Sequence, residues 1–222
     1  GVIIDIDDEK RRAQALLDSA QRDALTGLYN KAVAQRRIEE ALSADPGLCS
    51  ALFIIDVDNF KGINDTMGHL FGDALLIELS HTLQRQFRPQ DVVGRVGGDE
   101  FAVYLRDIPN RALAERKAEQ ILDVLSGLSV RERSVGAISC SVGIALTPEH
   151  GSTFHELYQR ADQALYRAKG SGRDCYQVYD PDDDPDPLPV HTLRSLRAVN
   201  ERIDSSEGSD AVFSQLIDCV LR

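Results

Sequence analysis

The stretch RVGGDEFAVYL, residues 95–105, decides the architecture that the sequence predicts. Both of its ends are rich in apolar and β-branched residues, and a pair of glycines divides them, which is typical of two antiparallel strands joined by a tight turn. Gly97 and Gly98 lack Cβ atoms, so they permit the backbone angles of such a turn and allow a ligand to approach the main chain. A hairpin is therefore the centre of the predicted fold.

Apolar periodicity on either side of this hairpin predicts further strands and helices. Their order, βαββαβα, indicates an α+β architecture in which an antiparallel-containing sheet carries helices on one face. The predicted strands cover about residues 49–55, 92–96, 101–105 and 137–146, and the predicted helices cover about residues 8–24, 31–42, 72–86, 111–125 and 154–169.

Composition predicts one globular domain with extensions. The 222-residue chain has 42% hydrophobic and 27% charged residues, so it can bury a core. Since it begins with Gly1, we expect a piece of a longer or processed protein. We expect residues 1–20 to be the end of an upstream module with a connector helix, 21–179 the globular domain, 180–190 an acidic, proline-rich linker and 191–222 a helical C-terminal extension.

Charge and cysteine usage exclude several classes of function. The net charge of −11 argues against binding to a nucleic-acid backbone through a basic surface. The four cysteines do not have the spacing of metal ligands, so a zinc site is not expected. Scattered cysteines are compatible with a reducing compartment, and we expect a cytoplasmic location. The sequence contains no run of about 18 apolar residues, so no membrane-spanning helix is predicted.

Carboxylates are expected to converge at one end of the sheet. Asp99 and Glu100 lie at the tip of the hairpin and Asp56 follows a buried strand, so their side chains can meet if these strands are neighbours. Adjacent negative charges require a cation, and carboxylate oxygens are ligands of Mg²⁺ or Mn²⁺. The alternative is a polar turn that faces water, which is commoner for a single Gly-Gly-Asp sequence.

Two further segments carry groups that suit a nucleotide. Residues 60–73 alternate glycines with polar side chains, so their backbone N–H groups can bind phosphate while Asn64 and Asp73 read the edge of a guanine. The alternative is a capped loop before the next helix. Lys169 and Arg173 follow the helix over 154–169, where they either stabilise its C-terminus or bind phosphate.

Several ordered motifs together resemble the GGDEF family of diguanylate cyclases over about residues 20–179. This resemblance implies a five-stranded sheet wrapped by helices, related to nucleotidyl cyclase and polymerase palm domains. The matching motifs are DALTGLYN at 23–30, FIIDVDNFKGINDTMGHLFGD at 53–73, GGDEF at 97–101, SVGIA at 141–145 and ADQALYRAK at 161–169.

The resemblance implies a nucleotidyl transfer that needs a homodimer. Two GTP molecules, one on each subunit, condense to cyclic di-GMP and pyrophosphate when each 3′-hydroxyl attacks the α-phosphorus of the other GTP. Asp56, Asp99 and the carbonyl of Val57 are the implied ligands of Mg²⁺, with Mn²⁺ as a substitute. Asp99 or Glu100 is implied to assist deprotonation of the hydroxyl.

The resemblance also implies the substrate contacts. The carboxylate of Asp73 favours GTP on both sides, because some relatives that make mixed cyclic dinucleotides depart from the family at this position. The implied contacts are Asn64 and Asp73 with guanine, and the main chain at Phe60 and Lys61 and the side chains of Lys169 and Arg173 with phosphates, while Gly97 and Gly98 let the substrate approach.

A regulatory site is implied by RPQD at residues 88–91, which resembles the inhibitory RxxD motif of the family. Arg88 and Asp91 would bind a dimer of cyclic di-GMP and hold the enzyme in an unproductive arrangement. A second arginine is needed, for which Arg111 and Arg116 are candidates. The alternative is a surface ion pair before a strand.

Two other functions are compatible with these motifs. The chain could be a catalytically silent module that binds GTP or cyclic di-GMP, although the signature acids are all present. It could also belong to a bifunctional protein with another domain downstream. Residues 1–11 resemble the end of a PAS-type sensory domain, so we expect the N-terminal helix to transmit a signal by changing the placement of two catalytic domains.

Overall fold

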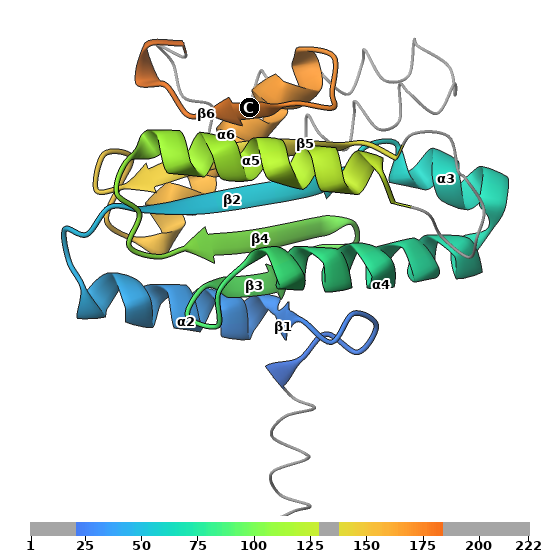
Figure 1. Cartoon of the computed structure of the whole chain (residues 1–222), viewed down its shortest axis with the longest axis horizontal. Helices are drawn as coiled ribbons and strands as arrows, with labels where there is room; N and C mark the ends of the chain where they lie inside the picture. The colour runs from blue at the N-terminus through green and yellow to red at the C-terminus, as the bar shows by residue number, and fades with distance from the viewer. Residues whose placement is uncertain (1–20, 129–137, 184–222) are drawn as a thin grey trace, which may run out of the picture.

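The computed structural model describes residues 21–128 and 138–183, which form a mixed six-stranded sheet covered by helices (Figure 1). The strand order is β1-β3-β4-β2-β5-β6; neighbours in the central part of the sheet are antiparallel, and β1 and β6 each pair in parallel at an edge. The strands are β1 (Tyr29–Asn30), β2 (Ser50–Val57), β3 (Val92–Arg95), β4 (Glu100–Leu105), β5 (Cys140–Thr147) and β6 (Tyr176–Val178).

The predicted α+β class and the hairpin are confirmed, but the sheet has one strand more than the five that the resemblance implied. The edge strands β1 and β6 contain only 2 and 3 residues. A strand this short cannot show an alternating pattern, so periodicity did not reveal either of them.

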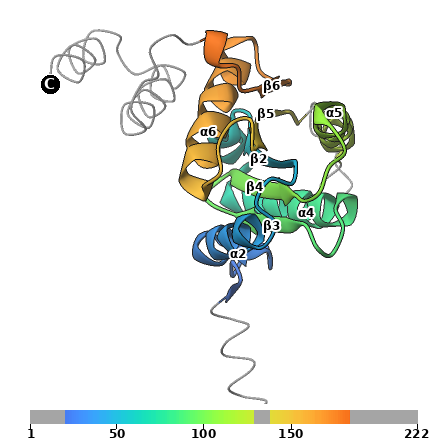
Figure 2. The same ribbon diagram turned by 90° about the vertical axis from the view of Figure 1, so that its left-hand side faces the viewer.

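Helices cover both faces of the sheet, so the expectation of helices on one face was wrong (Figure 2). The helices α2 (Lys31–Ala44) and α6 (Phe154–Gly170) pack on one face, and α4 (His69–Gln86) and α5 (Arg111–Ser126) pack on the other. Every residue of β2 and of β5 is buried, which is possible only if both faces are covered.

The segment after β2 forms a helix, α3 (Phe60–Met67), and not the loop that was one alternative. Phe60 and Ile63, at helical spacing, pack against the core, and these contacts stabilise α3 despite its internal glycine. Gly68 follows with a φ of 86°, a conformation that glycine adopts without strain, and α4 begins at His69, before the predicted start at Gly72.

Helix α6 lies unusually close to the central strand β5 because of one glycine. A Cβ atom on Gly143 would overlap the backbone oxygen of Ala161 and the backbone nitrogen of Leu165. The absence of a side chain at Gly143 therefore fixes the height of α6 above the sheet. This matters for the site, since the C-terminal turn of α6 carries Lys169.

Several predicted features lie outside the described residues. These are the connector helix before residue 21, the PAS-like segment, most of the linker and the C-terminal extension. The first residues of the predicted linker form a short 3-10 helix, Pro181–Asp183. Within residues 21–128 and 138–183, no helix has both the length and the apolar character needed to cross a membrane.

Candidate functional site

A cavity of about 350 Å³ opens where β2 ends. It lies among the end of β2, helix α3, the tip of the β3–β4 hairpin and the C-terminal end of α6. Its lining residues are Asp56, Val57, Asp58, Asn59, Phe60, Lys61, Asn64, Asp65, His69, Asp99, Lys169 and Arg173.

Most of the predicted site residues meet in this cavity. Those that line it are Asp56, Val57, Phe60, Lys61, Asn64, Asp99, Lys169 and Arg173, whereas Asp73, Gly97, Gly98 and Glu100 are not among its lining residues. The prediction missed Asp58, which lies two positions after Asp56. Since alternate residues of an extended chain share a face, the sequence Asp-Val-Asp could have indicated it.

Strand register brings the acidic residues together. Asp56 on β2 is opposite Glu100 on β4, and the backbone N–H of Val57 donates a hydrogen bond of 3.3 Å to the carbonyl oxygen of Asp99. The hairpin tip is thereby tied through its main chain to the end of the buried strand. The predicted convergence required the strands that carry Asp56 and Glu100 to be neighbours, and the pairing of β2 with β4 confirms this.

An ion pair joins the acidic and basic parts of the cavity. The Nζ atom of Lys169 lies 2.7 Å from Oδ1 of Asp56, and the side chains are only 16% and 5% exposed. The pair forms because Leu52, Ile54 and Asp56 alternate along the face of β2 that packs against α6. A carboxylate this well shielded from water requires a cation, which here is an ammonium group.

The residues present fit a magnesium site that is completed by a substrate. Among the described residues, no group of three or more His, Cys, Asp or Glu side chains is arranged to hold an ion. The carboxylates of Asp56 and Asp99 nevertheless line one cavity with two cations beside them. Mg²⁺ commonly binds one or two carboxylates and takes its other ligands from water and from substrate phosphates, so this donor set suits a Mg²⁺–nucleotide complex.

The side chain of Asn64 is seated against the next helix. Its Oδ1 atom is buried and has no hydrogen-bond partner within the described part of the chain. A Cβ atom on Gly72 would overlap this oxygen, so the glycine makes room for the amide. A buried acceptor without a donor is costly, and a donor group on a ligand would satisfy it.

The N-terminus of α3 offers backbone donors to the same cavity. Asn59, which precedes the helix with a left-handed φ of 51°, makes no side-chain capping hydrogen bond. Phe60 and Lys61 at the start of the helix line the cavity. The first N–H groups of a helix have no partner within the helix and attract anions, so this end of α3 suits a phosphate.

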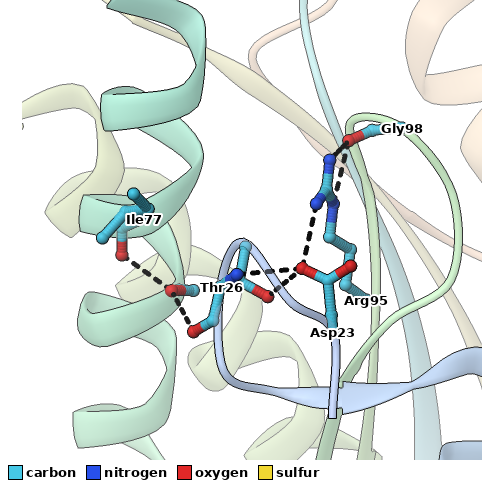
Figure 3. A network of polar contacts seen from close by, with 6 residues as sticks. Asp23, Thr26, Ile77, Arg95 and Gly98 are labelled. Atoms are coloured by element: carbon cyan, nitrogen blue, oxygen red, sulfur yellow. Dashed lines mark hydrogen bonds and ion pairs between the residues drawn. The ribbon is translucent and has the colours of Figure 1, made fainter. Parts of the chain in front are cut away.

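A hydrogen-bond network fixes the hairpin tip to the N-terminal turn of the domain (Figure 3). The guanidinium of Arg95 donates to the carbonyl oxygen of Gly98 at 2.6 and 3.0 Å and to the carboxylate of Asp23 at 2.9 Å. The same carboxylate accepts hydrogen bonds from the backbone N–H and the hydroxyl of Thr26. The turn is also held to α4, because the hydroxyl of Ser80 lies 3.3 Å from the carbonyl oxygen of Thr26.

Replacing Arg95 with glutamine should lower stability in a pH-dependent way. Burial alone would raise the pKa of Asp23, but hydrogen bonds from Thr26 and Arg95 outweigh burial and hold the pKa below its usual value of 3.8. We expect the variant to lose about 1–2 kcal/mol of unfolding free energy at pH 7. Because the folded-state pKa is depressed, the loss should shrink as the pH falls below 3.8 and Asp23 is protonated.

Urea unfolding at a series of pH values measures this difference. Arg36→Gln is the control, since the Arg36–Glu40 pair is 3.8 Å long with side chains 58% and 67% exposed. It should change the unfolding free energy by less than about 0.5 kcal/mol. An Arg95→Gln deficit that stays constant from pH 7 to pH 3 would show that the ion pair with Asp23 does not stabilise the turn.

The predicted inhibitory motif places its two residues in different environments. Asp91 is buried, and its carboxylate accepts hydrogen bonds from the backbone N–H groups of Arg88 at 2.8 Å and of Arg106 at 3.1 Å. The side chain of Arg88 is exposed. Asp91 therefore holds the turn before β3 together, and Arg88 is the residue of the motif that a ligand can reach.

Comparison with known proteins shows the family. The family model described as "Diguanylate cyclase, GGDEF domain" matches residues 20–175, more than half of the chain. The chain is 40% identical over 182 residues to the cyclic di-GMP phosphodiesterase PdeR of Escherichia coli (strain K12), and 38% identical over 162 residues to the diguanylate cyclase TpbB of Pseudomonas aeruginosa (strain UCBPP-PA14). These alignments cover 80% and 72% of this chain but 27% and 37% of the relatives, so the chain spans less than half of their length.

Solved structures agree with the sequence comparison. The GGDEF domain of TpbB from Pseudomonas aeruginosa matches with a TM-score of 0.70 and 36% identity, covering 74% of this chain and 97% of that one. The coiled coil and GGDEF domain of DgcB from Caulobacter crescentus, solved in complex with c-di-GMP, matches with a TM-score of 0.68 and 28% identity, covering 78% and 93%. The chain therefore belongs to the GGDEF family of diguanylate cyclase domains.

Proposed function

We propose that this chain is an active diguanylate cyclase domain that binds one Mg²⁺–GTP and, facing a second copy, condenses two GTP molecules into cyclic di-GMP and pyrophosphate. The observation that carries the proposal is the meeting of Asp56 and Asp99 with Lys169 and Arg173 in one cavity. Two carboxylates beside two cations suit a divalent ion and a triphosphate together. Mn²⁺ could replace Mg²⁺, because it takes similar oxygen ligands.

The triphosphate would be held by groups from two ends of the cavity. Lys169 and Arg173 would bind phosphate oxygens from the end of α6, and the backbone N–H groups of Phe60 and Lys61 would bind them from the start of α3. Lys169 would exchange its partner on binding, from the carboxylate of Asp56 to a phosphate oxygen. Asp56, Asp99 and the carbonyl of Val57 would hold Mg²⁺, which lowers the pKa of the attacking hydroxyl and neutralises charge on the leaving pyrophosphate.

The guanine would be read by Asn64 and Asp73. The buried Oδ1 of Asn64 has no donor among residues 21–128 and 138–183 and lies against Gly72, the neighbour of Asp73 on α4. Guanine presents the N1–H and N2–H₂ donors that two such acceptors need. Between the two acids at the tip, Asp99 lines the cavity and Glu100 does not, which favours Asp99 as the group closest to the reacting hydroxyl.

The proposed reaction makes association part of the chemistry. One cavity with one set of triphosphate-binding groups would hold one GTP, whereas the product contains two guanylate units. The second hydroxyl and the second α-phosphate must therefore come from a facing copy. An upstream sensory domain could control the activity by setting the distance between the two copies.

Product analysis over a series of protein concentrations tests this proposal. The purified chain is incubated with GTP and Mg²⁺, and nucleotides are separated by chromatography. Cyclic di-GMP that forms at a rate rising more steeply than linearly with protein concentration is the expected result. Measurable GTP binding without product at any concentration would contradict the cyclase proposal and favour a binding module.

A binding module without turnover is the second candidate. The observation that favours it is the ion pair between Lys169 and Asp56, which occupies the carboxylate needed for catalysis. The relative PdeR, to which this chain is 40% identical, is named a cyclic di-GMP phosphodiesterase and not a cyclase. The intact set of Asp56, Asp99, Lys169 and Arg173 makes the cyclase the better-supported function.

Replacing Arg88 with alanine should relieve product inhibition without reducing the initial rate. We propose that Arg88 binds cyclic di-GMP with help from another arginine, for which Arg111 and Arg116 are candidates. Arg88 is the residue to change, because the buried carboxylate of Asp91 accepts hydrogen bonds from two backbone N–H groups and its removal would disturb the fold. Initial rates measured against added cyclic di-GMP should show an inhibition constant raised at least about tenfold, which corresponds to one lost charged contact. An unchanged inhibition curve would reject the inhibitory role of RPQD.

A further inference from the structure

Asp58 is a buried carboxylate that none of the proposed catalytic steps uses. It is 7% exposed and lies just beyond the end of β2. Its Oδ1 accepts a hydrogen bond of 2.7 Å from the hydroxyl of Ser141, and its Oδ2 accepts one of 2.7 Å from the hydroxyl of Ser139. Oδ2 also accepts the backbone N–H of Asp174 at 3.1 Å. Asp58 thus connects the start of β5 with the turn that follows α6.

That turn is held in a conformation that its residues disfavour. Arg173 and Asp174 are consecutive non-glycine residues with left-handed φ values of 64° and 49°. Such residues cost of the order of 1 kcal/mol or more each and persist only where other contacts hold them. Two contacts do so here: the backbone N–H of Arg173 donates to the carbonyl oxygen of Ala168, and the backbone N–H of Asp174 donates to Asp58.

The conformation of this turn determines where Arg173 lies. Asp174 is the next residue, so the hydrogen bond to Asp58 fixes the backbone on the C-terminal side of Arg173. The side chain of Arg173 lines the cavity, as do Lys169 and Asp58 itself. If the bond to Asp174 were lost, the turn could relax toward common backbone angles and Arg173 would point elsewhere.

We propose that Asp58 is a positioning residue that holds the turn after α6 so that Arg173 faces the phosphates of the nucleotide. It acts through hydrogen-bond geometry and is not a ligand of the metal. The role of Arg173 rests on the proposed function. The role of Asp58 in holding the turn does not, and it can be measured without any nucleotide.

The matched pair Asp58→Ala and Asp58→Asn separates geometry from charge. Asparagine can place its Oδ1 where Oδ2 accepts from Ser139 and Asp174, and its amide can donate to the hydroxyl of Ser141, which accepts equally well. All of these contacts then survive while the negative charge is lost. Alanine removes all of them. Asp123→Ala, which removes an exposed carboxylate from α5, controls for the change in net charge.

Hydrogen exchange of the nucleotide-free protein is the first measurement. Asp58→Ala should speed exchange of the amides at 171–175 at least about tenfold, while Asp58→Asn and Asp123→Ala should leave it within about twofold of the wild type. If Asp58→Ala does not fold, the double variant Ser139→Ala/Ser141→Ala removes both hydroxyls that orient the carboxylate and should speed the same exchange. Unchanged exchange in the folded variants would overturn the proposal.

Nucleotide binding and kinetics give the second measurement. Asp58→Ala should raise the dissociation constant of a non-hydrolysable GTP analogue, and the KM for GTP, about tenfold, with a smaller change in kcat, as expected for one loosened charged contact. Asp58→Asn should restore both values. Loss of Mg²⁺ affinity in Asp58→Asn as large as in Asp56→Asn would make Asp58 a ligand and overturn the proposal. Faster exchange and weaker nucleotide binding without cyclic di-GMP formation would uphold it and reject only the cyclase activity.

Discussion

Replacing Asp99 with asparagine should abolish cyclic di-GMP synthesis and leave the fold intact. The carboxylate is half of the pair that we propose to hold Mg²⁺, and asparagine removes its charge while keeping its shape. Loss of metal-stabilised charge in the transition state is worth several kcal/mol, so we expect the rate to fall by about a thousandfold or more, which corresponds to about 4 kcal/mol.

The fold should survive this change because the tip is held by other groups. The backbone carbonyl of Asp99 accepts from Val57, and the guanidinium of Arg95 binds the carbonyl of Gly98. Circular dichroism and the urea midpoint should therefore match those of the wild type. Asp123→Asn, the same change on the exposed face of α5, is the control and should retain the wild-type rate. A folded Asp99→Asn variant with full activity would remove Asp99 from the metal site.

The sequence predicted the centre of the site because its acids follow structural signals that are local. Asp56 directly follows a continuous apolar run, and Asp99 follows a glycine pair, so each could be assigned to the end of an element. Whether the two ends meet depends on strand order, which periodicity does not contain. The resemblance to a family implied that the two ends meet, because it made Asp56 and Asp99 ligands of the same metal, and the pairing of β2 with β4 brings these ends together.

The residues that the sequence did not reveal act over long separations. Asp58 contacts Ser141 and Asp174, which lie 83 and 116 positions further along the chain. Asp23 and Arg95 are separated by 72 positions. The local Asp-Val-Asp pattern can place Asp58 on the face of Asp56, but no local pattern identifies the distant groups that Asp58 or Asp23 contacts, so these contacts emerge only in the folded structure.

The misassigned helix faces have a different origin. The prediction of helices on one face rested on the order of the elements alone. The apolar run of β2 already indicated that both faces of the sheet are covered. A strand with one solvent-exposed face alternates polar and apolar residues, but β2, with the sequence SALFIIDV, is almost uniformly apolar. Both faces had to be covered, and Asp56, the polar exception near its end, lies where the cavity opens.

Replacing Gly143 with alanine should destabilise the whole domain. The added Cβ would overlap backbone atoms of Ala161 and Leu165, and backbone in the middle of a helix cannot turn aside as a flexible side chain can. Helix α6 must lift from β5 or the strand must bend. Overpacking of this kind costs about 1–3 kcal/mol and occasionally more, and we expect about 3 kcal/mol because the two nearest clashing atoms are backbone. That is a large part of the 5–15 kcal/mol by which domains are typically stable.

Urea unfolding checks this expectation, with Gly127→Ala as the matched control. A Cβ on Gly127, after the end of α5, would meet its nearest atoms at 3.7 and 3.8 Å, which is ordinary contact, so its midpoint should stay close to that of the wild type. The folded fraction of Gly143→Ala should also bind GTP more weakly, since a lifted α6 carries Lys169 away from Asp56. An unchanged midpoint for Gly143→Ala would mean that the close approach of α6 to β5 does not fix the position of the cationic end of the site.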